Sequence, residues 1–244
     1  MINPPDSVPP VPRLIGLVGG TGWLSTLDYY RLINQGINRA LGGHEAARCV
    51  LYSLNFGDIM RLRALDPDLG GVRGLVVDAA RTVAGAGAKG VLLCANTLHL
   101  FAEAVEEAVS VPVIHIASAT AKAVNAQGLR TVGLLGTRPT MERDFYPTRL
   151  SAAGITTLIP EADDRTFIDH AILHELVQNV FRPEVKSRFL SIMVELGRRG
   201  AEGIVLGCTE IPLMIKPDET DLPMFDTLHI HAQAAVDFAL GAKT

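Results

Sequence analysis

The chain has 244 residues, 48% of them hydrophobic and 20% charged, with a net charge of −4 at pH 7. This length is enough to bury a core and to form two small α/β domains. The small negative charge and the lack of a Lys/Arg cluster argue against nucleic acid or a membrane surface as a partner. Cys49, Cys94 and Cys208 have neither the spacing of a disulfide framework nor that of a metal motif, which predicts a cytoplasmic protein without a metal.

The N-terminal segment, residues 1–12, contains five prolines. It lacks the apolar stretch that a signal peptide or a membrane span requires. We therefore expect a flexible, Pro-rich tail that precedes the folded part of the chain.

A glycine-rich turn follows the first predicted strand. The apolar run Leu14–Val18 ends in Gly19–Gly22, and a helix is expected directly afterwards. Such a turn brings backbone N–H groups to a small anion. The spacing is not GxGxxG, and the next strand, Cys49–Leu54, ends in Asn55 without an acidic residue for a ribose, so we expect no dinucleotide cofactor. Asn55 either lines the ligand crevice or satisfies its own turn. The turn contributes Gly20 and Thr21 as candidate binding residues.

Two stretches of the chain are copies of each other. GAKGVLLCANT (Gly87–Thr97) aligns without a gap with GAEGIVLGCTE (Gly200–Glu210), and the upstream segments RLIGLVGG and RTVGLLGT also match. Each copy reads as a buried strand that ends in a turn, where α/β sheets bind ligands. We therefore predict an α/β fold made of two copies of one module, whose strand ends face each other across the catalytic crevice. In this alignment Ala95, and not Cys94, is the counterpart of Cys208.

Polar residues at the strand ends are the candidate ligands of a substrate carboxylate. Asn96 and Thr97 stand where a helix is expected to begin, and backbone N–H groups there favour an anion. Thr137 follows the first strand of the second copy and suits either a carboxylate ligand or a helix cap. His99 falls inside the helix start and is expected to be structural.

Four motifs, GLVGGTGWLSTLDYYRLIN, YSLNFGDI, GLLGTRPTMERDFYPTRL and GIVLGCTEIPLMI, occur in order along the chain. With them, residues 13–240 resemble the cofactor-independent aspartate/glutamate racemase family. The resemblance implies two pseudo-symmetric αβα domains with mainly parallel sheets and an active site in the cleft between them. It places residues 13–116 and 226–244 in the first domain and residues 117–225 in the second. It also implies a substrate held between two facing cysteines, often in a homodimer.

The chemistry of such a site needs an acid and a base on opposite faces of the substrate Cα. The resemblance implies Cys208 and Cys94 as this pair, and a helix start after Cys208 is expected to favour its thiolate. In the family the first cysteine usually precedes Asn-Thr directly, whereas this chain has Ala95 there. Neighbouring residues near a strand end point to opposite sides, so Cys94 is expected to face away unless the turn is rebuilt.

The leading hypothesis is racemisation, without pyridoxal phosphate, of a small acidic amino acid such as aspartate or glutamate. Ala95 keeps two alternatives open: a one-cysteine decarboxylase or cis-trans isomerase of a small dicarboxylic acid, and a non-catalytic dicarboxylate binder. Family members differ from this chain at Thr21 and near Thr166, where the substrate side chain would be recognised. The predicted substrate-binding residues are Gly20, Thr21, Asn55, Ala95, Asn96, Thr97, Thr137, Thr166, Thr209 and Glu210.

Overall fold

The computed structural model of the chain describes residues 11–66 and 69–242. Of the predicted tail, residues 1–12, only Val11 and Pro12 fall within the described residues. Within the described ranges, no helix is long and apolar enough to cross a membrane.

The first half of the chain builds a parallel sheet of four strands in the order β2-β1-β3-β4. Its strands are β1 (Ile15–Gly19), β2 (Cys49–Ser53), β3 (Gly90–Leu93) and β4 (Val113–Ile114). Its helices are α1 (Trp23–Leu41), α2 (Phe56–Leu65), α3 (Gly70–Gly85), the 3-10 turn η1 (Thr97–Phe101) and α4 (Ala102–Ala108). Every residue of β1 and β3 is buried, because helices cover both faces of the sheet.

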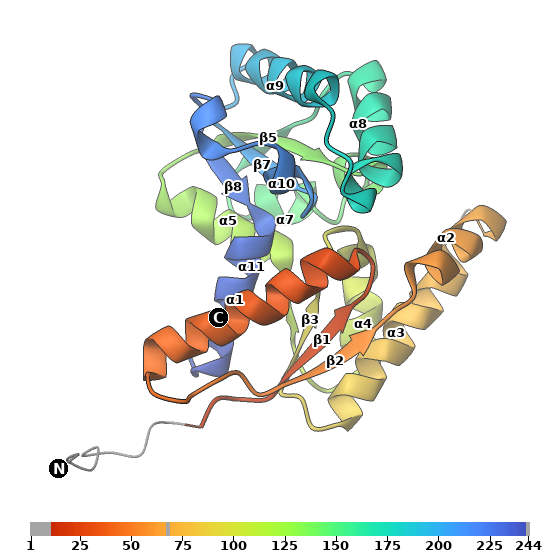
Figure 1. Cartoon of the computed structure of the whole chain (residues 1–244), viewed down its shortest axis with the longest axis vertical. Helices are drawn as coiled ribbons and strands as arrows, with labels where there is room; N and C mark the ends of the chain where they lie inside the picture. Colours follow the sequence, from red (N-terminus) through yellow and green to blue (C-terminus); the bar gives the residue numbers. More distant parts are fainter. Residues whose placement is uncertain (1–10, 67–68, 243–244) are drawn as a thin grey trace.

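The second half repeats this plan with a parallel sheet in the order β6-β5-β7-β8. The strands are β5 (Thr131–Gly136), β6 (Thr156–Leu158), β7 (Gly203–Gly207) and β8 (Met224–Asp226). The helices are α5 (Ile116–Ala126), α6 (Arg138–Glu142), α7 (Pro147–Ala152), α8 (Ala162–His174), η2 (Leu176–Gln178), α9 (Pro183–Arg198), α10 (Ile211–Met214) and η3 (Pro217–Glu219). The equal strand order of the two sheets shows the two-domain fold, as the repeat predicted (Figure 1).

The last helix, α11 (Thr227–Ala239), leaves the second sheet and packs on the first domain against α1 (Figure 1). Ala232, Ala235 and Val236 share a core with Tyr29 and Ile33 of α1. Gly36 permits this close approach, since a Cβ there would lie 2.5 Å from Val236 Cγ2. The helix therefore joins the two domains and fixes their strand ends relative to each other.

The glycine turn after β1 depends on the absence of a side chain. Gly20 has φ +90°, and a Cβ at this position would lie 2.0 Å from the backbone oxygen of Leu54. Only glycine fits so close a contact in a left-handed conformation. The turn thereby brings the end of β1 beside the end of β2.

Two helices begin where the sequence predicted loops. Asn55 accepts a hydrogen bond from the N–H of Gly57, as expected of a turn residue, but this turn is the N-cap of α2. The polar composition of residues 160–165 is typical of a loop, yet α8 begins at Ala162. Asp163 and Asp164 lie in its first turn, where negative charge stabilises a helix, so a polar composition was a misleading sign of a loop.

Candidate active site

A cavity of about 100 Å³ lies between the two domains at the carboxyl ends of their strands. Thr21 and Thr97 reach it from the turns after β1 and β3, and Thr137 and Cys208 reach it from those after β5 and β7. This volume is room for a few water molecules or one small ligand. The cavity therefore stands where α/β sheets of this type bind ligands.

Cys208 and Glu210 form a hydrogen-bonded polar pair on the cavity. Cys208 follows β7 directly, is 7% exposed, and donates a hydrogen bond from Sγ to Glu210 Oε2 over 3.0 Å. The hydroxyl of Thr209 donates to the same carboxylate oxygen over 2.9 Å. All three residues line the cavity, so the thiol can meet a ligand there while it bonds to the carboxylate.

The thiol of Cys208 is held in its protonated form. Burial raises its pKa well above the ordinary value, and the negative charge and hydrogen bond of Glu210 raise it further. The backbone N–H groups of Glu210 and Ile211 act in the opposite direction but do not prevail. The expectation of a thiolate at a helix start is thus corrected, because the carboxylate lies next to the sulfur and α10 has only four residues.

Ala95 occupies the position in the first domain that Cys208 occupies in the second. It lines the cavity, whereas Cys94 does not. Cys94 is 1% exposed and packs in the core with Leu17, Leu92 and Ile114. Burial raises its pKa, and its Sγ is 3.7 Å from the backbone oxygen of Leu92. The turn after β3 does not bring Cys94 to the cavity. Cys94 faces away, and the methyl group of Ala95 takes the position of the first thiol.

The carboxylate of Glu210 lies against the glycine turn of the first domain. A Cβ on Gly22, which has φ +125°, would lie 2.7 Å from Glu210 Oε1. Gly22 is the N-cap of α1, a helix of 19 residues whose N-terminus attracts negative charge. A carboxylate of the protein itself thus lies beside the turn at which the sequence predicts a small anion.

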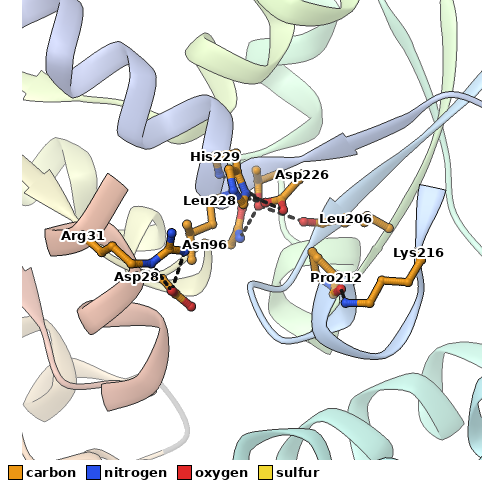
Figure 2. A network of polar contacts seen from close by, with 10 residues as sticks. Asp28, Arg31, Asn96, Leu206, Pro212, Lys216, Asp226, Leu228 and His229 are labelled. Atoms are coloured by element: carbon orange, nitrogen blue, oxygen red, sulfur yellow. Dashed lines mark hydrogen bonds and ion pairs between the residues drawn. The ribbon is translucent and has the colours of Figure 1, made fainter. Parts of the chain in front are cut away.

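Asn96 connects the two strand ends through a chain of hydrogen bonds. Its Nδ2 donates to Thr227 Oγ1 over 3.0 Å, and Thr227 donates to the backbone oxygen of Leu206 in β7 over 2.8 Å. Figure 2 shows Asn96 and Leu206 on either side of the start of α11, where Asp226 is the N-cap. Among the described residues, Asn96 Oδ1 and Thr21 Oγ1 are buried and have no hydrogen-bond partner. Both residues line the cavity, so they suit a polar ligand.

Three threonine hydroxyls meet at the boundary between the domains. Thr137 Oγ1 is 2.9 Å from Thr97 Oγ1 and 3.1 Å from Thr140 Oγ1. Thr97 and Thr137 line the cavity, as the sequence predicted. Thr137 stands at the N-cap of α6 but makes no side-chain cap there, and its role as a carboxylate ligand stays a prediction.

Three of the predicted binding residues do not line the cavity. Gly20 shapes the turn behind Thr21, and exposed Asn55 caps α2, which was the structural alternative for this residue. Thr166 is exposed on α8, where its hydroxyl donates to the backbone oxygen of Ala162 and accepts from Arg138. The remaining candidates, Thr21, Ala95, Asn96, Thr97, Thr137, Thr209 and Glu210, all lie on the cavity.

His99 holds the backbone of Ala95. The N–H of Ile116 donates to His99 Nε2 over 3.2 Å, so the ring proton is on Nδ1, which donates to the backbone oxygen of Ala95 over 3.0 Å. Burial lowers the pKa of His99 to about 4 and therefore keeps the ring neutral. In the described part of the chain, no group of three or more His, Cys, Asp and Glu side chains could hold a metal ion.

Apart from Arg63, the cavity residues that sequence reasoning missed are apolar. Phe56, Ile59 and Met60 of α2 line the cavity together with Ile172 and Leu173 of α8. The sequence gives a weak signal for them, because apolar residues at helical spacing usually mark packing against a sheet. Only the position of the helices beside the strand ends makes them part of the site.

The fold and the site define a two-domain α/β protein with a small-molecule cavity at facing strand ends. The chain belongs to the Asp/Glu/hydantoin racemase family, whose model matches residues 18–235.

Individual relatives are similar over most of the chain. A Yersinia pestis protein classed as an Asp/Glu racemase is 39% identical with a TM-score of 0.86, and the match covers 93% of this chain and 99% of that one. An aspartate racemase homologue from Pyrococcus horikoshii is 30% identical with a TM-score of 0.77 over the same shares of both chains. The broad specificity amino-acid racemase RacX of Bacillus subtilis is 23% identical over 173 residues, which are 69% of this chain and 73% of RacX.

Proposed function

We propose that this protein moves a proton at the α-carbon of a small amino acid or a related carboxylic acid, with Cys208 as the only reacting thiol. The observation that carries the proposal is the Cys208–Glu210 pair on a cavity whose opposite strand end presents Ala95. Membership of the racemase family supports chemistry at the α-carbon. The unpartnered oxygens of Asn96 and Thr21 suit the ammonium group of an amino acid.

The two residues of the pair have complementary roles. Glu210 accepts the thiol proton, and the resulting thiolate removes the α-proton of the substrate, which leaves a planar carbanion. Return of this proton from Cys208 regenerates the same enantiomer, with the proton from Glu210 restored to the sulfur. Inversion needs a proton donor on the opposite face, and Ala95 has none to give. The protein is therefore expected to exchange the α-proton faster than it inverts the centre.

The test is the comparison of proton exchange with inversion in D2O. Loss of the α-proton signal of one enantiomer is followed by NMR, and inversion is followed by circular dichroism. Rapid exchange with slower inversion is the expected result, and Cys208→Ala should reduce exchange about 100-fold or more. Equal rates of exchange and inversion in the wild type would show that a second acid faces Cys208, and would refute the one-thiol mechanism.

A second candidate reaction is the decarboxylation of a substituted malonate. The observation that favours it is the raised pKa of Cys208, because a protonated thiol is ready to donate. Loss of carbon dioxide leaves the electron pair on the α-carbon, the thiol donates its proton there, and water reprotonates the sulfur. Release of carbon dioxide from an α-substituted malonate, absent in Cys208→Ala, would support this reaction over proton exchange.

We also propose a homodimer that uses the exposed face of α1. Trp23, Leu27 and Tyr30 are 63%, 54% and 51% exposed, and their spacing places them on one side of the helix. An exposed group of large apolar residues on a helix is typical of an interface. Sedimentation should show a dimer in the wild type and a monomer in Leu27→Lys; a wild-type monomer at high concentration would contradict this.

The cysteines support a reducing compartment such as the cytoplasm as the site of action. All three, Cys49, Cys94 and Cys208, are free thiols. Oxidation of Cys208 by peroxide should stop proton exchange, and a thiol reductant should restore it. Exchange that continues after full oxidation of Cys208 would contradict the role of this thiol.

A further inference from the structure

Helices of both domains line the cavity with apolar residues, which together are called the apolar wall. This wall consists of Ile59 and Met60 of α2, Val72 of α3, Phe101 of η1, and Ile172 and Leu173 of α8. None of these side chains can form a hydrogen bond beyond the weak acceptor of Met60. The polar residues of the cavity, Cys208 and Glu210 among them, come instead from the turns that follow the strands.

The apolar wall is preformed. Ile59, Val72 and Phe101 are 8%, 4% and 7% exposed and belong to one core cluster of the first domain. Ile172 is 1% exposed and belongs to the core of the second domain. Close-packed core residues do not move aside for a charged group without a loss of stability. The wall therefore presents the same surface to every ligand.

Charge is nearly absent from this part of the cavity. Among the described residues that line it, Arg63 is the one with a positive charge. Arg63 is half-buried and also borders a surface depression with Arg138 and Arg143, so it stands at the mouth of the cavity. A side-chain carboxylate against the apolar wall would lose its water without gaining a partner, which is costly.

We infer that the substrate of the proposed reaction carries an apolar α-substituent, aliphatic or aromatic, that packs on the apolar wall while its reacting carbon faces Cys208. This inference rests on the proposed function and names the substrate class of the same cavity. It departs from the acidic amino acid that the sequence resemblance implied. The carboxylate and the ammonium group of the ligand stay beside Thr21 and Asn96.

The experiment uses three amino acids of nearly equal side-chain shape: leucine, asparagine and aspartate. Binding of both enantiomers of each to the wild type is measured by calorimetry, and α-proton exchange is measured separately. Leucine should bind about 10- to 100-fold more tightly than aspartate, because burial of the apolar leucine side chain stabilises the complex. Asparagine should bind with an intermediate affinity. Aspartate binding more tightly than leucine, or no measurable binding of leucine, would overturn the inference.

Two substitutions at the half-buried Met60 make the test specific to the apolar wall. Met60→Lys adds a cation to the wall and should reverse the order, so that aspartate binds more tightly than leucine. Met60→Leu keeps the wall apolar and should retain the wild-type order. The same order of affinities in both variants would show that the side chain lies elsewhere and would overturn the inference.

Arg63→Met separates the apolar class from the acidic one. With this charge removed, leucine should still bind more tightly than aspartate. If the wild type instead prefers aspartate and this preference disappears in Arg63→Met, the side-chain carboxylate of the substrate binds Arg63 and the inference is refuted. The two measurements distinguish failure of the proposed reaction from failure of this inference. Tight binding of leucine without proton exchange would refute the proposed reaction and support the apolar substrate class. Proton exchange on aspartate alone would support the proposed reaction and refute the apolar substrate class.

Discussion

The two domains share one backbone plan but end their central strands in different side chains. β3 and β7 hold the same place in sheets of equal strand order, and the residues that follow them onto the cavity are Ala95 and Cys208. One strand end offers a methyl group and the other a thiol that bonds to a carboxylate. The duplicated fold therefore supplies two equivalent positions around a ligand, while the side chains decide whether chemistry takes place on one face or on both.

The two strand ends are also held in different ways. His99 donates to the backbone oxygen of Ala95 and fixes the main chain of the first site. In the second site, Glu210 accepts from Cys208 itself and so acts on the reactive group. Asn96 and Thr227 connect the two through hydrogen bonds. The first strand end is thus held through its main chain, and the second through the thiol that the proposed proton transfer would use.

The difference between the two strand ends is tested most strongly by removing the buried thiols of Cys208 and Cys94 in turn. Cys208→Ala should reduce α-proton exchange about 100-fold or more, because no other thiol reaches the cavity. Cys94→Ala is the matched control and should retain exchange while it lowers the free energy of unfolding by about 1 kcal/mol, since Cys94 packs in the core. Exchange is followed by NMR and stability by urea denaturation. A greater loss of exchange in Cys94→Ala than in Cys208→Ala would reverse the assignment.

Ala95→Cys should make the two strand ends alike. Ala95 is half-buried and lines the cavity, so the added sulfur faces the ligand. Inversion should rise about tenfold or more relative to exchange, because a donor then stands on each face of the carbanion. The ratio of the two rates, from circular dichroism and NMR, is the measurement. A folded, ligand-binding variant with an unchanged ratio would show that Ala95 is not opposite Cys208.

The sequence was sufficient to predict the fold, and it also predicted which residues stand at the two facing strand ends. The apolar runs bounded by glycines correspond to β1, β3, β5 and β7, and their repetition predicted the duplication. The alignment of the two copies also predicted that Ala95 would occupy the place of a thiol. These features are local in the chain or repeat within it, so they can be read without coordinates.

The apolar wall and the state of the thiol could not be predicted in this way. Met60 and Leu173 have the spacing of ordinary packing residues, and only the fold brings α2 and α8 to the same cavity. Glu210 is two residues from Cys208, yet the sequence does not tell whether its carboxylate turns toward the sulfur or toward the ligand. The protonation of Cys208 depends on that orientation and on burial.

Buried histidines beside the first strand end predict a loss of stability in mild acid. Burial lowers the pKa of His99 to about 4 and that of His231 well below its usual value, while Tyr29 and the backbone oxygen of Ile114 bond to the His231 ring. Below about pH 6.5 these histidines bind protons in the unfolded chain but stay neutral in the folded chain. The free energy of unfolding therefore falls as the pH falls. For His99 this loss should be about 1 to 2 kcal/mol between pH 6.5 and pH 5, and His231 should add a loss in the same direction.

Urea denaturation across this pH range measures the effect. His99→Asn retains an N–H donor for Ala95 but cannot titrate, so its stability should depend less steeply on pH than that of the wild type. His44→Gln, at an exposed position, is the control and should keep the wild-type slope. A His99→Asn slope equal to that of the wild type would mean that His99 is charged in the folded protein.

The smallest expected effect concerns the carboxylate of the second strand end. Glu210→Gln removes a negative charge 3.0 Å from Cys208 Sγ and keeps the shape of the side chain. Because that charge raises the pKa of the thiol, the substitution should lower this pKa and increase the thiolate fraction at neutral pH. The ultraviolet absorbance of the thiolate during a pH titration, with Cys208→Ala as the blank, reports the change. Burial continues to raise the pKa in the variant, so the thiol stays less acidic than in water. An unchanged titration curve would mean that the charge of Glu210 does not act on the thiol, in which case the proton on Cys208 is held by burial alone.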